Sequence, residues 1–353
     1  MAQSALPDTG LLVVKVGSSL IAGDSPFSLP GLVADLSGRS DPVVIVSSGA
    51  VALGREATGE KRRGADLVLA ERQALAAIGQ PLLQRLWREA FAGEGHSTAQ
   101  ILLTPDITDH RSRYLNARSA LRALINRGVV PIINENDAVA TDELRYGDND
   151  GLAARVAGLI DADTLLLLSD IDGLYDKNPN EHMDASPVPT VEWGGIDRYR
   201  AVAGPSASSS GTGGMQSKIE AAALATGWGV RTVIASGHHA RPLSALDVGA
   251  RSTLFEPGPR STSRRRWLAG AVERQGAVDI DEGAVDAITK GASLLSVGVK
   301  NVTTPFLAGD VVEVRCGGDA VAYGLALCDA AAMNDFKILI HRDNLVLKSS
   351  SER

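Results

Sequence analysis

Short aliphatic runs alternate with helical stretches from residue 11 to about residue 256, and this alternation limits the folds open to the chain. Continuous apolar strands between helices predict a mainly parallel sheet covered on both faces, a three-layer α/β sandwich. The expected strands are 11–16, 43–47, 99–103, 129–133, 164–169 and 231–235. The expected helices are 66–91, 113–126, 151–160 and 216–226. In such folds ligands bind beyond the carboxyl ends of the strands.

Two glycine-containing loops, far apart in the chain, each carry a lysine. Lys15-Val-Gly-Ser-Ser follows the first apolar strand, and Gly211-Thr-Gly-Gly-Met-Gln-Ser-Lys218 precedes a helix-prone stretch. Small residues let backbone N–H groups approach an anion, and a helix N-terminus adds a favourable field. Neither loop matches the common P-loop motif. Each alone also fits an ordinary turn with a solvated lysine, but together they indicate phosphoryl transfer on a different scaffold.

Polar residues are concentrated after the strand expected at 129–133. Asn134 and Asp137 follow that strand, and Asn149 and Asp150 come just before an expected helix. One interpretation is a polar turn and a capped helix. The functional interpretation is a site whose amide and carboxylate groups bind a ligand amine and carboxylate, while one aspartate orients the lysines.

Two further strand ends carry polar groups. Ser48 and Gly49 offer a hydroxyl and backbone donors to a small acid, although they also suit a simple helix cap. Ser169 and Asp170 close a strand made almost wholly of leucine, where they form either a turn or a contact to nucleotide.

Composition narrows the class of protein. A length of 353 residues predicts two or three domains, and a net charge of −7 argues against a general polyanion binder. Cys316 and Cys328 are the only cysteines, too few for a structural zinc site, so we expect reduced thiols. The adjacent His238 and His239 point differently and make a poor metal site. With no basic leader and no apolar run of membrane-spanning length, we expect a cytoplasmic protein.

The alternation of aliphatic runs with helical stretches ends at about residue 256. Residues 257–275 are predicted to form a connector, and we expect Arg264 to Arg266 within it to be solvated charges. The segment 276–353 predicts a small β-barrel-like domain with strands at 294–299, 311–315, 321–327 and 338–340. Before the connector, the Ser-, Gly- and Pro-rich segment between 172 and 216 is either a linker or a cover over bound nucleotide.

Taken together, these motifs resemble the glutamate 5-kinase family of the amino acid kinase superfamily, in order and in spacing. The quoted lysine loops match it, as do Val46 to Val51, Asn134 to Asp137, Gly147 to Asp150 and Ser169 to Tyr175. The tail resembles the PUA domain that many bacterial members carry. The resemblance therefore implies an amino acid kinase domain at 1–256 and a PUA domain at 276–353.

The resemblance implies ATP-dependent phosphorylation of the side-chain carboxylate of L-glutamate, the first step toward proline. Lys15 and Lys218 are implied to neutralise the transferring phosphoryl group, and Asp150 to organise them. The implied glutamate-binding residues are Ser48, Gly49, Asn134, Asp137 and Asn149. The implied ATP-binding residues are Lys15, Ser169, Asp170, Thr212, Gly213, Gly214, Met215, Gln216, Ser217 and Lys218. Mg²⁺ is implied to bridge the phosphates, with protein ligands that the sequence does not identify.

Residue chemistry agrees independently. A glutamate carboxylate is already ionised at neutral pH, so no general base is needed and none stands out among the candidates. What remains is positioning and charge neutralisation. Because the acyl-phosphate product is labile, coupling to glutamyl-phosphate reductase is sensible. The family also implies proline as feedback inhibitor and a homo-oligomer.

Two alternatives remain at this stage. One is another kinase of the superfamily, acting on N-acetylglutamate, aspartate, carbamate or a nucleoside monophosphate. The other is an RNA-binding protein whose kinase-like part only senses nucleotide. Residues 276–353 hold seven Lys and Arg against eleven Asp and Glu, so RNA binding by the tail is not expected.

Overall fold

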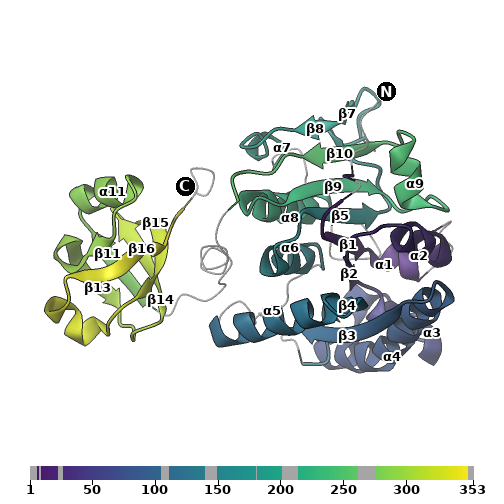
Figure 1. Cartoon of the computed structure of the whole chain (residues 1–353), viewed down its shortest axis with the longest axis horizontal. Coiled ribbons are helices and arrows are strands. Elements are labelled where there is room, and N and C mark those ends of the chain that lie inside the picture. The colour runs from purple at the N-terminus through teal and green to yellow at the C-terminus, as the bar shows by residue number, and fades with distance from the viewer. Residues whose placement is uncertain are drawn as a thin grey trace. The chain divides into compact units, whose positions relative to one another are not determined.

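The computed structural model describes residues 6–7, 9–22, 27–104, 111–139, 149–179, 181–200, 214–260 and 276–348. The chain forms two compact units, the first of which ends at Arg260 (Figure 1). The predicted domain ends at 256 and 276 lie on either side of this division, and they remain predictions. Among the helices of the described residues, none is long and apolar enough to cross a bilayer.

An eight-stranded sheet forms the middle layer of the first unit (Figure 1). Its strand order is β3-β4-β2-β1-β5-β9-β10-β8, and every neighbouring pair is parallel except β9 with β10. The bounds are β1 Leu12–Val16, β2 Val43–Ser47, β3 Ser97–Leu103, β4 Val129–Glu135, β5 Thr164–Ser169, β8 Thr190–Val191, β9 Arg231–Ser236 and β10 Ser252–Phe255.

Helices cover both faces of this sheet, α5, α6 and α8 on one and α2, α3, α4 and α9 on the other (Figure 1). Their bounds are α1 Ser18–Ile21, α2 Leu29–Ser37, α3 Ala50–Thr58, α4 Leu69–Gly93, α5 Arg111–Ile125, α6 Asn149–Ile160, α7 Asp197–Arg200, α8 Met215–Gly227 and α9 Pro242–Asp247. The predicted three-layer fold is confirmed.

Strand alternation decides which face receives Lys15. Successive side chains of a strand point to opposite faces. Leu12, Val14 and Val16 belong to the core that packs against α2, α4 and α9. Lys15 therefore projects to the face covered by α6 and α8, although it lies in a strand that is buried throughout.

Helices α3 and α4 cross with their backbones in contact. A Cβ on Gly54 would lie 2.0 Å from the carbonyl oxygen of Leu75, and one on Gly79 would lie 1.8 Å from that of Ala50. Only glycine fits at either position, because real Cβ atoms do not approach so closely. This crossing fixes the position of the α4 backbone beside the first turn of α3.

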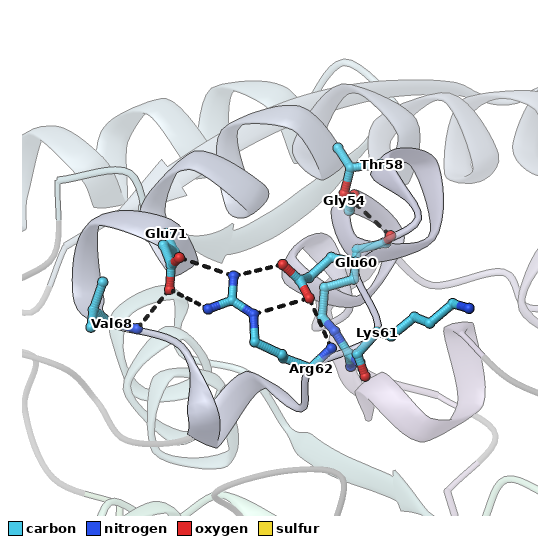
Figure 2. Close-up of polar contacts among 8 residues, drawn as sticks. Gly54, Thr58, Glu60, Lys61, Arg62, Val68 and Glu71 are labelled. Atoms are coloured by element: carbon cyan, nitrogen blue, oxygen red, sulfur yellow. Dashed lines mark hydrogen bonds and ion pairs between the residues drawn. The ribbon is translucent and has the colours of Figure 1, made fainter.

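A single arginine closes the turn between these two helices (Figure 2). The guanidinium of Arg62 binds both carboxylate oxygens of Glu60 and both of Glu71. Glu71 also accepts a hydrogen bond from the backbone N–H of Val68 at 3.1 Å, which caps the start of α4. The hydrogen bonds from Arg62 lower the pKa of Glu60 to about 2 and also lower that of Glu71.

The segment expected to be a linker or cover is partly ordered by strand pairing. β6 (Leu174–Tyr175) pairs with β7 (Pro187–Val188), and β8 pairs with β10 at the sheet edge. The buried Thr253 hydroxyl accepts from the Leu174 N–H and donates to the Val188 carbonyl. Residues 201–213 lie outside the described residues, so the role of a cover stays a prediction.

The second unit is built on a six-stranded sheet in the order β12-β16-β15-β14-β11-β13. The bounds are β11 Gly276–Ile280, α11 Glu282–Thr289, β12 Leu294–Leu295, β13 Val299–Thr304, β14 Val311–Cys316, β15 Asp319–Ala326 and β16 Ile338–Leu347. The strand predicted at 294–299 is wrong as a single element. A 3-10 turn over Ser296–Gly298 interrupts it, and the chain pairs with β16 before the turn and with β11 after it.

The predicted elements of the first unit are confirmed with small shifts in their ends. Two differences affect the site: β4 continues to Glu135, so Asn134 lies inside the strand, and α6 begins at Asn149. The predicted helix at 66–91 begins at Leu69, because residues 64–66 form a separate 3-10 turn. The elements of this unit that lie outside the predicted ranges are helices α1, α2, α3, α7 and α9 and strands β6, β7, β8 and β10.

Candidate active site

Two lysines from distant loops share one aspartate. Lys15 Nζ lies 2.6 Å from Oδ1 of Asp150, and Lys218 Nζ lies 3.0 Å from Oδ2. All three side chains are at most 5% exposed. Since a buried ammonium group needs a counter-charge or an anionic ligand, the array suits a bound polyanion. The three predicted catalytic residues therefore lie together, although their roles remain to be tested.

The start of α8 adds further anion-binding groups. Gly214 precedes the helix without a side-chain cap, and Lys218 lies in the first turn. N–H groups of a first helical turn have no intrahelical partner and lie at the positive end of the helix dipole. Ser217 Oγ lies 3.1 Å from Asp150 Oδ2, which links this turn to the lysine pair. Met215 and Gln216 open the helix, whereas Thr212 and Gly213 lie outside the described residues.

A cluster of amides lies directly beside the charged array. Asn149 Nδ2 donates to Ser48 Oγ and to Asn134 Oδ1, each at 2.8 Å. Asn134 Nδ2 in turn donates to Oε1 of Gln80 at 2.8 Å. Because Asn149 and Asp150 are consecutive at the start of α6, one turn of helix joins the amide cluster to the lysines.

The loop after β2 is held in place from α4. Trp87 Nε1 donates to Ser47 Oγ at 2.8 Å, and Ser47 Oγ donates to the carbonyl of Ser48. Gly49 follows with φ +115° and precedes α3, a conformation that favours glycine. These contacts place Ser48 beside Asn149 at the carboxyl end of β2.

The remaining predicted residues lie at neighbouring strand ends. Ser169 ends β5, and its hydroxyl donates to Asp170 Oδ1 at 2.8 Å. Asp170 is exposed, as expected for a residue that contacts a ligand from outside. Asp137 is half-buried in the turn after β4. Their assignment to ATP or to glutamate stays a prediction.

Gln80 is the residue of this site that sequence reasoning missed. It lies inside α4, is 9% exposed and binds Asn134. A glutamine in the middle of a helix carries no local signal of function. The only hint is its setting between Gly79 and Pro81, two residues that are unusual inside a helix.

A resident metal site is not evident in the described residues. They contain no group of three or more His, Cys, Asp and Glu side chains arranged to hold an ion, and His238 and His239 are therefore not part of such a group. Both oxygens of Asp150 already face ammonium groups. Since Mg²⁺ commonly binds through one or two carboxylates together with substrate phosphates, this donor set fits an ion that arrives with the nucleotide.

Comparison with known proteins agrees with this geometry. A model of the amino acid kinase family matches residues 10–236, and a model of the PUA domain matches 276–344. The glutamate 5-kinase of Nitrobacter hamburgensis is 46% identical over 363 residues, which cover 95% of each chain. Those of Bradyrhizobium sp. (98% of each chain) and Caulobacter vibrioides (93% of this chain, 90% of the relative) are both 44% identical. The chain belongs to the glutamate 5-kinase family of amino acid kinases.

Membership of the glutamate 5-kinase family confirms the resemblance seen in the sequence. It also confirms the predicted kinase activity, the PUA domain and the use of ATP. The alternative of an RNA-binding protein whose kinase-like part only senses nucleotide is thereby set aside. The roles of the individual site residues stay predictions.

Proposed function

We propose that the chain transfers the γ-phosphoryl group of ATP to the side-chain carboxylate of L-glutamate at the carboxyl ends of β1, β2, β4 and β5. The observation that carries this proposal is the junction of Asn149 and Asp150. One residue belongs to an amide cluster suited to a small amino acid, and the next to a lysine array suited to phosphates.

The lysine array accounts for the transfer step. The attacking carboxylate is already ionised, so no proton has to be removed from it. Lys15 and Lys218 neutralise the charge on the transferring group, and Asp150 holds both ammonium groups in a fixed arrangement. Because the three side chains are buried, water screens their charges weakly.

The amide cluster accounts for substrate binding. Among the described residues, Oδ1 of Asn149 is buried without a hydrogen-bond donor. This oxygen suits the α-ammonium group of glutamate, and Ser48, Gly49 and Asp137 complete the glutamate site in this proposal. On the nucleotide side we assign the start of α8 to the phosphates, and Ser169 and Asp170 to ATP. Mg²⁺ bound with ATP supplies further charge neutralisation on the phosphates.

Trapping of the acyl phosphate as hydroxamate tests the proposal. The full chain is assayed with MgATP and glutamate, N-acetylglutamate, aspartate or carbamate. Signal with glutamate alone is expected. Signal with another acid would keep the lysine array but reject the assigned substrate site. Asn149→Ala is expected to raise the KM for glutamate, and Lys218→Ala to lower kcat.

We also infer three properties of the chain in its pathway. Proline competes with glutamate, the enzyme works as a homo-oligomer, and a reductase consumes the labile acyl phosphate promptly. The tail has a net charge of −4, so we assign it a regulatory or assembly role rather than RNA binding. Inhibition kinetics against proline and sedimentation of the full chain test the first two properties.

A further inference from the structure

Three buried amides form a hydrogen-bonded chain that runs from the interior of α4 to the start of α6. Gln80 Oε1 accepts from Asn134 Nδ2, and Asn134 Oδ1 accepts from Asn149 Nδ2, both at 2.8 Å. The exposed fractions of Gln80, Asn134 and Asn149 are 9%, 2% and 8%. Buried amides are held by such partners, because an unmet donor or acceptor is costly away from water.

The contact of Asn149 with a backbone carbonyl determines which amide atoms donate and which accept in this series of hydrogen bonds. Asn149 Nδ2 lies 3.4 Å from the carbonyl oxygen of Ser47, which can only accept a hydrogen bond. The amide of Asn149 therefore presents its nitrogen to this side, and the adjoining atom of Asn134 must be its oxygen. The nitrogen of Asn134 then points to α4, where Gln80 supplies an acceptor.

This arrangement leaves one atom available. The hydrogen bonds that join Asn149 to Asn134 and Asn134 to Gln80 are both formed. Asn149 Oδ1, in contrast, has no donor among the described residues, and it is buried. An amide oxygen in that situation requires a hydrogen-bond donor. Glutamate carries one as its α-ammonium group, whereas glutarate has the same two carboxylates without it.

The backbone of Gln80 cannot move away from the site freely. The preceding residue, Gly79, lies at the crossing of α3 and α4, where an added Cβ would lie 1.8 Å from the carbonyl oxygen of Ala50. The crossing thus holds the Gln80 side chain at a set distance from Asn134. Without an acceptor at position 80, the nitrogen of Asn134 would be left buried and unpaired, and its amide would turn to find another partner.

We propose that Gln80 is a positioning residue: through Asn134 it directs Oδ1 of Asn149 toward the substrate ammonium group, and so sets the preference for an acid with a free α-amine. The proposal rests on the assignment of Asn149 to the glutamate site. It concerns the amine end of the substrate and leaves the transfer step to the lysines.

The test compares Gln80→Met with Gln84→Met in the full-length enzyme. Gln84 is a matched control, one helical turn further along α4 and outside the amide chain. The measured quantities are the KM for glutamate, the KM for ATP and the inhibition constant of glutarate. For Gln80→Met we expect the glutamate KM to rise about tenfold, with the other two constants within about twofold. Gln84→Met is expected to change none of them.

Equal weakening of glutamate and glutarate by Gln80→Met would overturn the proposal, since a merely structural loss does not distinguish the two acids. If that variant does not fold, Gln80→Asn keeps an amide but withdraws it from Asn134, and the same split between the two acids is expected. Asn149→Ala separates the two levels of inference. If it abolishes the enzyme's preference for glutamate over glutarate while Gln80→Met and Gln80→Asn leave that preference unchanged, the glutamate site stands and the role of Gln80 fails. If Asn149→Ala also leaves that preference unchanged, the glutamate site itself is wrong.

Discussion

The ammonium group of Lys15 lies 2.6 Å from Oδ1 of Asp150, and neither side chain is more than 5% exposed. Lys218 binds the other oxygen of the same carboxylate. One aspartate therefore organises two cations that come from opposite ends of the first unit's sequence.

Asp150→Asn removes the negative charge that the two lysines share. We expect kcat to fall at least about a hundredfold, and the free energy of unfolding to fall by about 3–5 kcal/mol, because buried ammonium groups lose their counter-charge. Chemical denaturation without ligand and steady-state kinetics measure the two effects. Addition of MgATP is expected to recover part of the stability. Full stability without ligand would contradict the role given to Asp150.

Lys218→Ala, unlike Asp150→Asn, is expected to leave stability nearly unchanged. It also lowers kcat about a hundredfold or more, but it relieves the repulsion between two ammonium groups on one carboxylate, so the unfolding midpoint should stay near that of the parent. Lys177→Ala is a matched control, because Lys177 pairs with Asp184 at an exposed site. It should leave kcat unchanged. An unfolded Lys218→Ala protein would show that Lys218 is structural.

Gly79→Ala tests the helix crossing that supports Gln80. The added Cβ would lie 1.8 Å from the carbonyl oxygen of Ala50 and 2.6 Å from the nitrogen of Gly54. We expect a loss of about 3 kcal/mol in stability, with a higher glutamate KM in the protein that remains folded. Gly93→Ala in the same helix meets nothing within 4 Å and should stabilise by less than about 1 kcal/mol. Equal thermal midpoints for the two variants would refute this prediction.

The carboxyl group of Glu60 should titrate far below its ordinary range. Hydrogen bonds from Arg62 lower the pKa of Glu60 from 4.5 to about 2 (Figure 2). A lowered pKa in the folded protein means that this contribution to stability is present above pH 4.5 and is lost as the pH falls toward 2. NMR titration of the side-chain carboxyl carbon measures the midpoint. In Arg62→Ala the midpoint should return toward 4.5, whereas Arg63→Ala, which removes the partner of Asp66, should not move it.

Much of the first unit could be predicted because its strands are nearly continuous apolar runs. β2 and β5 were predicted to the residue, since parallel strands buried on both faces leave little doubt about their ends. Strands at the sheet edge gave no such signal: β8 is two residues long, and β10 is partly polar. The break between β12 and β13 was missed because the run Leu294 to Val299 is mostly aliphatic, including Val297 inside the 3-10 turn, and so is typical of one strand.

The sequence by itself determined the elements, the two lysine loops and the polar strand ends, because each depends on residues close together in the chain. Only the tertiary structure decided that Lys15 and Lys218 meet on Asp150, and that Gln80 joins Asn134 and Asn149. The first depends on which face of β1 each side chain takes and on where α6 and α8 begin. The second depends on two helices that touch at Gly54 and Gly79. Contacts of this kind arise from packing between distant segments, and a local pattern carries no record of them.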